Sequence, residues 1–256
     1  MAVNLLSASD ARIDFGDIAA IGGQTEITVS ITFKPSTMST NRIVGKWGTG
    51  HAMLMQGVNT DEIGFVVQGP GPLNTQFFGR QTTDLNVTAG TLYRVVARWK
   101  ASTPEMQLWV NGVDRTVVEF VGSNPAATSI ADNDESLQVG HETSTATDGI
   151  DGDYSELAVH FSFMPDDYCV AYGKGYSPRF YRRSGLLYCP MWNVGNLRDL
   201  WGANHGTNSS GTSAAHSSII LPSGPQIRRM TTAAAAQVAL IQPHVTLQRS
   251  QRMIAY

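Results

Sequence analysis

The sequence predicts an all-β protein, a two-sheet antiparallel jelly-roll sandwich with one short helix and an extended C-terminal tail. From Ala11 to about His160, short alternating or apolar runs are bounded by Gly, Pro, Asn and Asp, which is the pattern of strands joined by turns. Apolar residues make up 42% of the 256 residues and charged residues 15%, with 25 Gly and 11 Pro, a composition typical of turn-rich β proteins. No amphipathic helix interrupts the runs.

Each strand is predicted from one such run. The expected strands are Ala11–Phe15, Glu26–Lys34, Asn41–Lys46, His51–Gln56, Glu62–Gln68, Gln76–Arg80, Leu92–Lys100, Met106–Val110, Thr116–Phe120, Leu137–Val139 and Asp153–Phe161. The clearest pair is Thr91–Trp99 with Met106–Val113, and Asn111-Gly112 predicts a hairpin because a type I′ turn needs positive φ at both central residues.

The chain beyond this region changes character. Met164–Lys174 predicts a short helix that opens at Pro165, has Asp166 and Asp167 near its positive end and carries Cys169 on its inner face. Leu186–Met191 predicts a strand and Leu197–Ser213 a series of turns. We therefore expect a sandwich over residues 1–222, including its closing strand, and an arm over residues 223–256.

Charge is distributed unevenly between these two parts. The formal net charge is −3, and all 21 acidic residues lie at or before Asp199. The tail is basic, because the only formally charged residues after Asp199 are four arginines: Arg228, Arg229, Arg249 and Arg252. No run of about 18 apolar residues occurs and Asp10 and Asp14 interrupt the N-terminus, so neither membrane insertion nor secretion is predicted.

Two cysteines are too few for a disulfide framework. Cys169 and Cys189 lack the CxxC spacing of a zinc site. Two free, buried thiols are the favoured interpretation, and a bridge between them is the alternative.

Several fragments, in their order and spacing, resemble the laminin-G/concanavalin-A-like lectin domains. They are Ala11–Asp17, Glu26–Pro35, Ile43–Trp47, Tyr93–Trp99, Leu108–Gly112, Leu137–Gly140 and Ile150–Leu157. A later run resembles an extension attached to this domain in phage structural proteins: Gly175–Pro178, Leu186–Met191, Arg198–Leu200, Gly202–Thr207 and Ile219–Pro222. The resemblance implies a non-enzymatic virion component.

Catalytic motifs are weak. Glucanases of the concanavalin-A-like fold carry paired acids as E-x-D-x-x-E, whereas Asp151, Asp153 and Glu156 lack that spacing. Asp153 and Glu156 are three positions apart, so on a regular strand they would face opposite sides. No G-x-S-x-G elbow, H-x-x-x-H pair or phosphate-binding glycine loop occurs, and no enzyme activity is expected.

Ligand-binding candidates are of two kinds. Asp148, Asp151 and Asp153 near a Gly-rich turn offer the oxygen ligands that calcium takes, although solvated turn aspartates are the favoured interpretation and no cofactor is required. Of the five tryptophans, Trp99 and Trp109 are expected in the core. Trp47 and Trp201, flanked by Gly and Asn, are candidates for stacking on a glycan.

The tail is the predicted partner-binding element. Its residues Arg228, Arg229, Val245, Leu247, Arg249, Arg252 and Tyr256 suit an arm laid along a neighbouring protein, with Val245–Leu247 adding a strand to a sheet edge. Four scattered arginines are too few for a nucleic-acid surface. The leading hypothesis is a capsid decoration or stabilising protein on the virion surface, homo-oligomeric in the assembly and bound to other virion proteins. The alternative is a carbohydrate-binding module for host adsorption.

Overall fold

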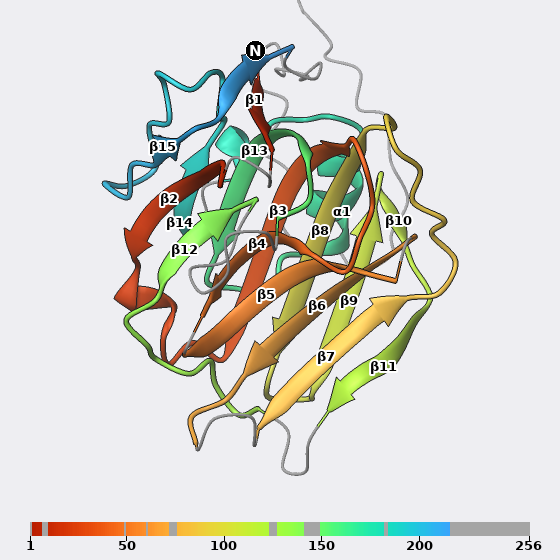
Figure 1. Cartoon of the computed structure of the whole chain (residues 1–256). Helices are drawn as coiled ribbons and strands as arrows, with labels where there is room; N and C mark the ends of the chain where they lie inside the picture. The colour runs from red at the N-terminus through yellow and green to blue at the C-terminus, as the bar shows by residue number, and fades with distance from the viewer. Residues whose placement is uncertain are drawn as a thin grey trace, which may run out of the picture. The chain divides into compact units, whose positions relative to one another are not determined.

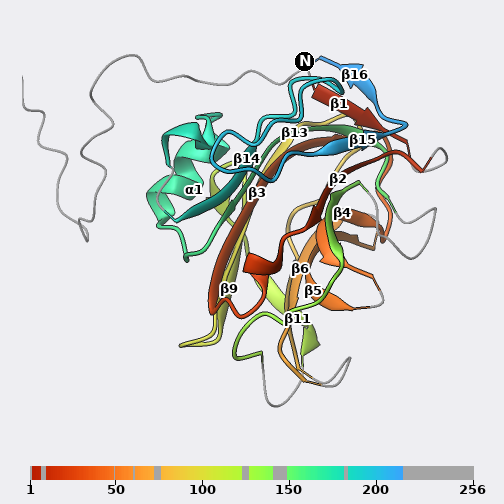
Figure 2. The ribbon, with the colours of Figure 1, turned by 90° about the vertical axis from the view of Figure 1, so that its left-hand side faces the viewer.

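Two antiparallel sheets form the molecule over residues 2–6, 10–48, 50–59, 61–71, 76–122, 127–140, 149–181 and 184–215, which the computed structural model describes. Each sheet has eight strands, and the two stack face to face as layers (Figures 1 and 2). Sheet A has the order β10-β9-β8-β3-β13-β1-β16, with β14 also paired to β13, and sheet B has the order β11-β7-β6-β5-β4-β12-β2-β15. The predicted sandwich is confirmed.

The strands of sheet A are β1 (Ala2–Leu5), β3 (Glu26–Pro35), β8 (Tyr93–Lys100), β9 (Glu105–Val110), β10 (Val113–Asp114), β13 (Gly152–His160), β14 (Gly185–Cys189) and β16 (Thr212–Ala214). Those of sheet B are β2 (Arg12–Asp17), β4 (Arg42–Trp47), β5 (His51–Val58), β6 (Glu62–Gln68), β7 (Phe77–Thr82), β11 (Val117–Gly122), β12 (Ser136–Val139) and β15 (Thr207–Ser209). The helix α1 spans Asp166–Gly173, and the 3-10 turns η2 and η3 span Ala19–Ile21 and Pro178–Phe180.

Most predicted strands appear with ends shifted by only a few residues. The Asn111-Gly112 turn is confirmed, since both residues have positive φ (53° and 79°) and Val110 pairs with Val113. This turn joins β9 to the two-residue β10, whereas β8 pairs with β9 through the preceding turn. The prediction of turns alone over Leu197–Ser213 was wrong, because β15 and most of β16 lie there and extend the sheets beside β2 and β1.

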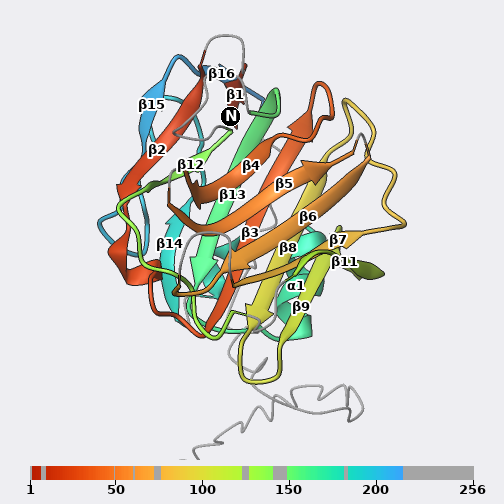
Figure 3. The ribbon, with the colours of Figure 1, turned by 60° about the horizontal axis from the view of Figure 1, so that its bottom comes forward.

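The main core lies between the two sheets. Strand alternation sends one face of each sheet inward, so that Val29, Ile31 and Phe33 of β3 oppose residues such as Phe65 and Val67 of β6 in one buried cluster. In Figure 3 the strands β4–β6 of sheet B cross in front of β3, β8 and β9 of sheet A. The predicted core position of Trp99 is confirmed, as it is fully buried in this cluster.

A second buried layer lies on the outer face of sheet A, beneath α1 (Figure 2). Because the outward residues of β3 are small and polar, they hydrogen-bond buried tyrosines: Ser30 Oγ lies 2.7 Å from the Tyr168 hydroxyl, and Thr32 Oγ1 lies 3.0 Å from that of Tyr172. Trp109 is buried in this layer rather than between the sheets. The helix therefore closes part of sheet A and leaves its β1 side uncovered by α1.

The helix follows the sequence prediction closely. Pro165 is its N-cap, Asp166 and Asp167 stand in its first turn, and Cys169 is fully buried against sheet A. None of the described helices is long and apolar enough to span a membrane.

Candidate functional site

Three rings gather on the outer face of sheet B, and we call Trp47, His51 and Phe77 the aromatic cluster. A register shift between β4 and β5 places His51 opposite Trp47. The two rings stack with centroids 4.0 Å apart and planes 9° apart, and Phe77 lies 6.1 Å from each. All three residues are partly exposed. The molecular surface therefore carries a group of three rings here and not Trp47 alone.

Strand ends position this cluster. Trp47 ends β4, His51 begins β5 and Phe77 begins β7, and these strand ends lie along one rim of sheet B (Figure 1). Phe77 is directed outward because its neighbour Phe78 belongs to the main core. Sequence reasoning identified Trp47 but missed His51 and Phe77. His51 meets Trp47 only because of the register shift between β4 and β5. Phe77 lies thirty positions further along the chain, in a different hairpin.

A buried amide fixes the imidazole of the cluster. Gln68, the cross-strand partner of Phe77 at the end of β6, places its Oε1 3.0 Å from His51 Nδ1. Because an amide oxygen only accepts, Nδ1 donates in this pair, and in the neutral imidazole Nε2 is then the acceptor nitrogen. The cluster thus combines apolar ring faces with an oriented polar edge.

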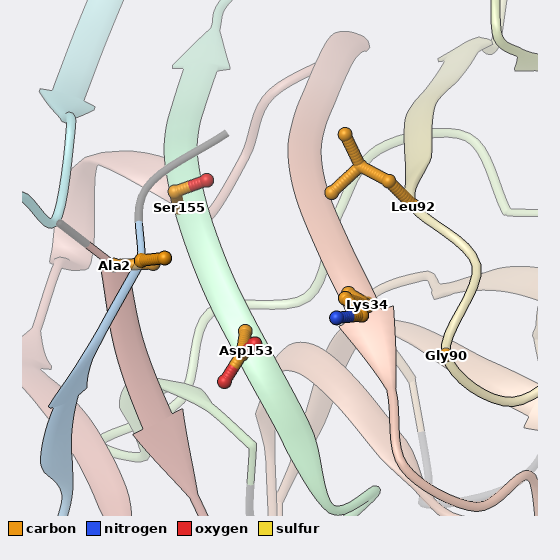
Figure 4. A pocket seen from close by; sticks show the side chains of 7 residues that line it. Ala2, Lys34, Gly90, Leu92, Asp153 and Ser155 are labelled. Atoms are coloured by element: carbon orange, nitrogen blue, oxygen red, sulfur yellow. The ribbon is translucent and has the colours of Figure 1, made fainter. Parts of the chain in front are cut away.

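A pocket with different chemistry opens on the outer face of sheet A (Figure 4). Its volume is about 330 Å³, and its lining residues are Ala2, Lys34, Gly90, Leu92, Asp153, Ser155 and Ala215. Asp153 Oδ1 accepts a hydrogen bond of 2.7 Å from Asn4 Nδ2, and Lys34 is its cross-strand neighbour. The pocket offers charges and a hydroxyl but no aromatic ring.

The other predicted glycan candidate, Trp201, lies in a different setting. It is only 8% exposed and packs edge-on against His160 at 4.9 Å and tilted against Tyr188 at 5.3 Å. Since these contacts cover its ring, Trp201 offers little surface for stacking on a sugar, and we do not include it in the candidate site.

Of the three aspartates considered for calcium, the structure describes two. Asp153 lines the sheet A pocket, the Asp151 carbonyl accepts a hydrogen bond of 2.8 Å from Ser36 N, and Asp148 lies outside the described residues. Within the described ranges, no three His, Cys, Asp or Glu side chains are grouped so that they could hold a metal ion. The tail residues Arg228, Arg229, Val245, Leu247, Arg249, Arg252 and Tyr256 also lie outside the described part.

The expectation that Asp153 and Glu156 face opposite sides was wrong. The register of β13 against β3 shifts between Ser155 and Ala158, and Glu156 has a φ of 56°, so a β-bulge inserts one residue and turns both carboxylates to the outer face. Glu156 is buried and accepts a hydrogen bond of 2.8 Å from the Tyr188 hydroxyl. The two acids have separate surroundings: Asp153 lines the sheet A pocket, whereas Glu156 accepts hydrogen bonds from the buried tyrosines Tyr188 and Tyr172.

Both thiols are free and buried, as predicted. Desolvation by burial raises the pKa of Cys169 to about 12 and that of Cys189 to about 12. Since the thiolate is the nucleophile and metal ligand, neither cysteine is available for such chemistry near neutral pH.

No protein-family model and no curated protein matches this chain. Among solved structures, the chain is similar to a protein of Bacteroides ovatus named for an inferred role in carbohydrate binding, with a TM-score of 0.63, 15% identity, and coverage of 86% of this chain and 61% of that one. It is also similar to a heptameric SAP-like pentraxin from Limulus polyphemus, with a TM-score of 0.51, 14% identity, and coverage of 70% and 82%. At these identities the likeness shows the fold alone, which is that of the concanavalin-A-like β-sandwich.

Proposed function

We propose that this chain is a carbohydrate-binding module whose ligand stacks on the aromatic cluster. The observation that carries the proposal is the partly exposed group of Trp47, His51 and Phe77 on the outer face of sheet B. A sugar ring has an apolar face of C–H groups and a rim of hydroxyls. Aromatic rings with polar edges match both surfaces at once.

The polar edge supports the same assignment. Because Gln68 Oε1 lies at hydrogen-bond distance from His51 Nδ1, the Nε2 atom of the neutral imidazole would accept from a ligand hydroxyl without a change of tautomer. An arrangement fixed before the ligand arrives lowers the entropy lost on binding. The name of the Bacteroides ovatus protein, which shares the fold, agrees with this proposal but does not carry it.

The test is a glycan array probed with the whole chain and with two matched variants. Trp47→Ala removes the largest ring of the cluster, whereas Trp192→Ala removes a tryptophan that is 38% exposed elsewhere on the surface. We expect Trp47→Ala to weaken binding at least about tenfold, equal to about 1.4 kcal/mol, and Trp192→Ala to bind like the wild type. Equal binding by all three proteins would contradict the site assignment.

A third variant separates the two candidate surfaces. Asp153→Ala removes a charge from the sheet A pocket without touching the aromatic cluster. If this variant loses glycan binding while Trp47→Ala keeps it, the pocket and not the cluster is the binding site.

A virion structural role is a second candidate, favoured by the charge division in the sequence. All 21 acids precede the arginine-containing tail, as suits a surface domain whose arm binds a neighbouring protein, and a glycan-binding module on a virion would combine both roles. Deletion of Ser223–Tyr256 should then abolish binding to particles and leave the sandwich folded. Unchanged occupancy on particles would exclude this role for the arm.

A further inference from the structure

A fully buried lysine lies in the hairpin of β4 and β5, which carries Trp47 and His51 of the aromatic cluster. The side chain of Lys46, next to Trp47 in β4, has no exposed surface. Its Nζ donates to Asp17 Oδ1, Asn133 Oδ1 and the Glu135 carbonyl at 2.8 Å each, and also to the Asn133 carbonyl. We call these four oxygens the Lys46 cage.

The cage has the chemistry of a cation site. All four atoms are hard oxygen donors, of the carboxylate, amide and carbonyl kinds that calcium takes in proteins. Three of them come from Asn133 and Glu135, two positions apart in one loop, and the fourth comes from the end of β2. An ammonium group has only three N–H bonds, yet four oxygens surround it. The oxygens are therefore arranged around a positive charge and are not matched one to one with N–H groups.

One wall of the cage reaches the solvent. The Asp17 side chain is 38% exposed although Lys46 is fully covered. A smaller residue at position 46 would leave the four oxygens facing the space that the ammonium now fills, with the Asp17 carboxylate at its solvent side.

The same loop holds the turn between β4 and β5. Glu135 Oε1 accepts a hydrogen bond of 3.1 Å from Gly50 N, and Asn133 Oδ1 accepts one of 3.1 Å from Glu135 N. A Cβ on Gly48 would lie 2.5 Å from the Glu135 carboxylate, so the loop and the turn are in close contact. The position of this turn fixes how Trp47 and His51 meet.

We propose that the Lys46 ammonium holds this loop in place in the same way as a bound divalent ion would, by attracting the four oxygens of the cage. A small neutral residue at position 46 would then turn the cage into a divalent-cation site. This site is separate from the aspartates Asp151 and Asp153, which do not contribute to the cage. The metal-binding part is independent of the proposed function. Only its consequence, that Lys46 positions the aromatic cluster for a ligand, rests on that function.

The test compares calcium responses of the melting temperature among full-length variants. Lys46→Ser should melt below the wild type in chelator and recover by about 5 °C or more in millimolar calcium, because an ion that binds only the folded state stabilises it. The wild type serves as the reference, and Lys100→Ser is the matched control, since Lys100 pairs with Glu105 at 2.7 Å outside the cage. Both should show a smaller calcium response than Lys46→Ser.

Two further variants make the result specific. Lys46→Met fills the cage with an uncharged side chain and should gain no calcium response. Adding Asp17→Asn to Lys46→Ser removes the carboxylate ligand and should abolish the recovery. A calcium response of Lys46→Ser no larger than that of the wild type, or one that survives Asp17→Asn, would overturn the proposal.

If Lys46→Ser does not fold in chelator, refolding with and without calcium gives the same readout, and failure to recover with calcium overturns the proposal. No glycan enters these measurements, so their outcome is distinguishable from that of the glycan array.

Discussion

A single methyl group should separate helix α1 from the hairpin against which it packs. A Cβ built on Gly173 would lie 1.8 Å from Gly112 N, 2.2 Å from Gly112 Cα and 2.4 Å from Asn111 C. Carbon atoms in contact normally lie about 3.5–4.0 Å apart. Gly173→Ala therefore requires the end of α1 and the Asn111-Gly112 turn to move apart by more than an ångström.

The sign of this effect opposes helix propensity. An alanine in place of glycine would favour an isolated helix by roughly 0.5–1 kcal/mol, whereas overpacking costs about 1–3 kcal/mol and occasionally more. Because the overlaps at Gly173 are severe, we take the upper end of the overpacking cost and expect a net loss of about 2 kcal/mol in the free energy of unfolding, or about 4–8 °C in melting temperature for a domain of this size.

Urea denaturation followed by near-ultraviolet circular dichroism measures this loss. Gly195→Ala is the control, because its Cβ would meet only Asn193 Oδ1, at 3.3 Å, and its stability should stay within about 0.5 kcal/mol of the wild type. A Gly173→Ala protein as stable as the wild type would refute the close packing of α1 on the hairpin.

Three further predictions concern the buried polar groups. The free energy of unfolding should fall as pH rises from about 9 towards 12, because burial raises the pKa of Cys169 and Cys189 to about 12 in the folded state. The stability that the two neutral thiols contribute is complete below their unfolded pKa and is lost as pH rises towards the folded pKa. A flat profile of urea midpoints from pH 8 to 11 would contradict this. Tyr172→Phe should cost about 1–3 kcal/mol by removing the hydroxyl that bonds Thr32 Oγ1 and the Glu156 carbonyl, and the double variant with Thr32→Val should recover part of that loss. Additive losses in a double-mutant cycle would exclude the coupling. Glu156→Gln should cost about 1 kcal/mol, since an amide keeps only one of the two side-chain oxygens that can accept a hydrogen bond from the Tyr188 hydroxyl, and an unchanged denaturation midpoint would show that this hydrogen bond does not stabilise the packing of Tyr188.

The strands of the sandwich were predictable because their signals are local. Alternation over Glu26–Lys34 and the Asn111-Gly112 pair each depend on neighbours in sequence, and the structure has β3 and a hairpin there. The strands β15 and β16 were missed because each is three residues long and is stabilised by pairing with β2 and β1, far away in the chain. Short strands of this kind carry no pattern of their own.

The site was less predictable because it depends on register and contacts between distant strands. The bulge at Glu156 reversed an argument that assumed a regular strand. Trp201 follows a turn-like sequence, yet contacts with His160 and Tyr188 cover it. Trp47 was identified from its flanking residues, but its partner Phe77 comes from another hairpin and the Lys46 cage from a loop almost ninety positions away.

The central claim is that a glycan stacks on the aromatic cluster, and indole NMR tests it most directly. The chain has five tryptophans, so tryptophan-labelled protein gives a small set of Nε1–H signals that single substitutions can assign. During titration with the best ligand from the array, the Trp47 signal should shift saturably, while those of buried Trp99 and of Trp192, which is not part of the cluster, should stay in place. Saturable binding that leaves the Trp47 signal unmoved would contradict the account.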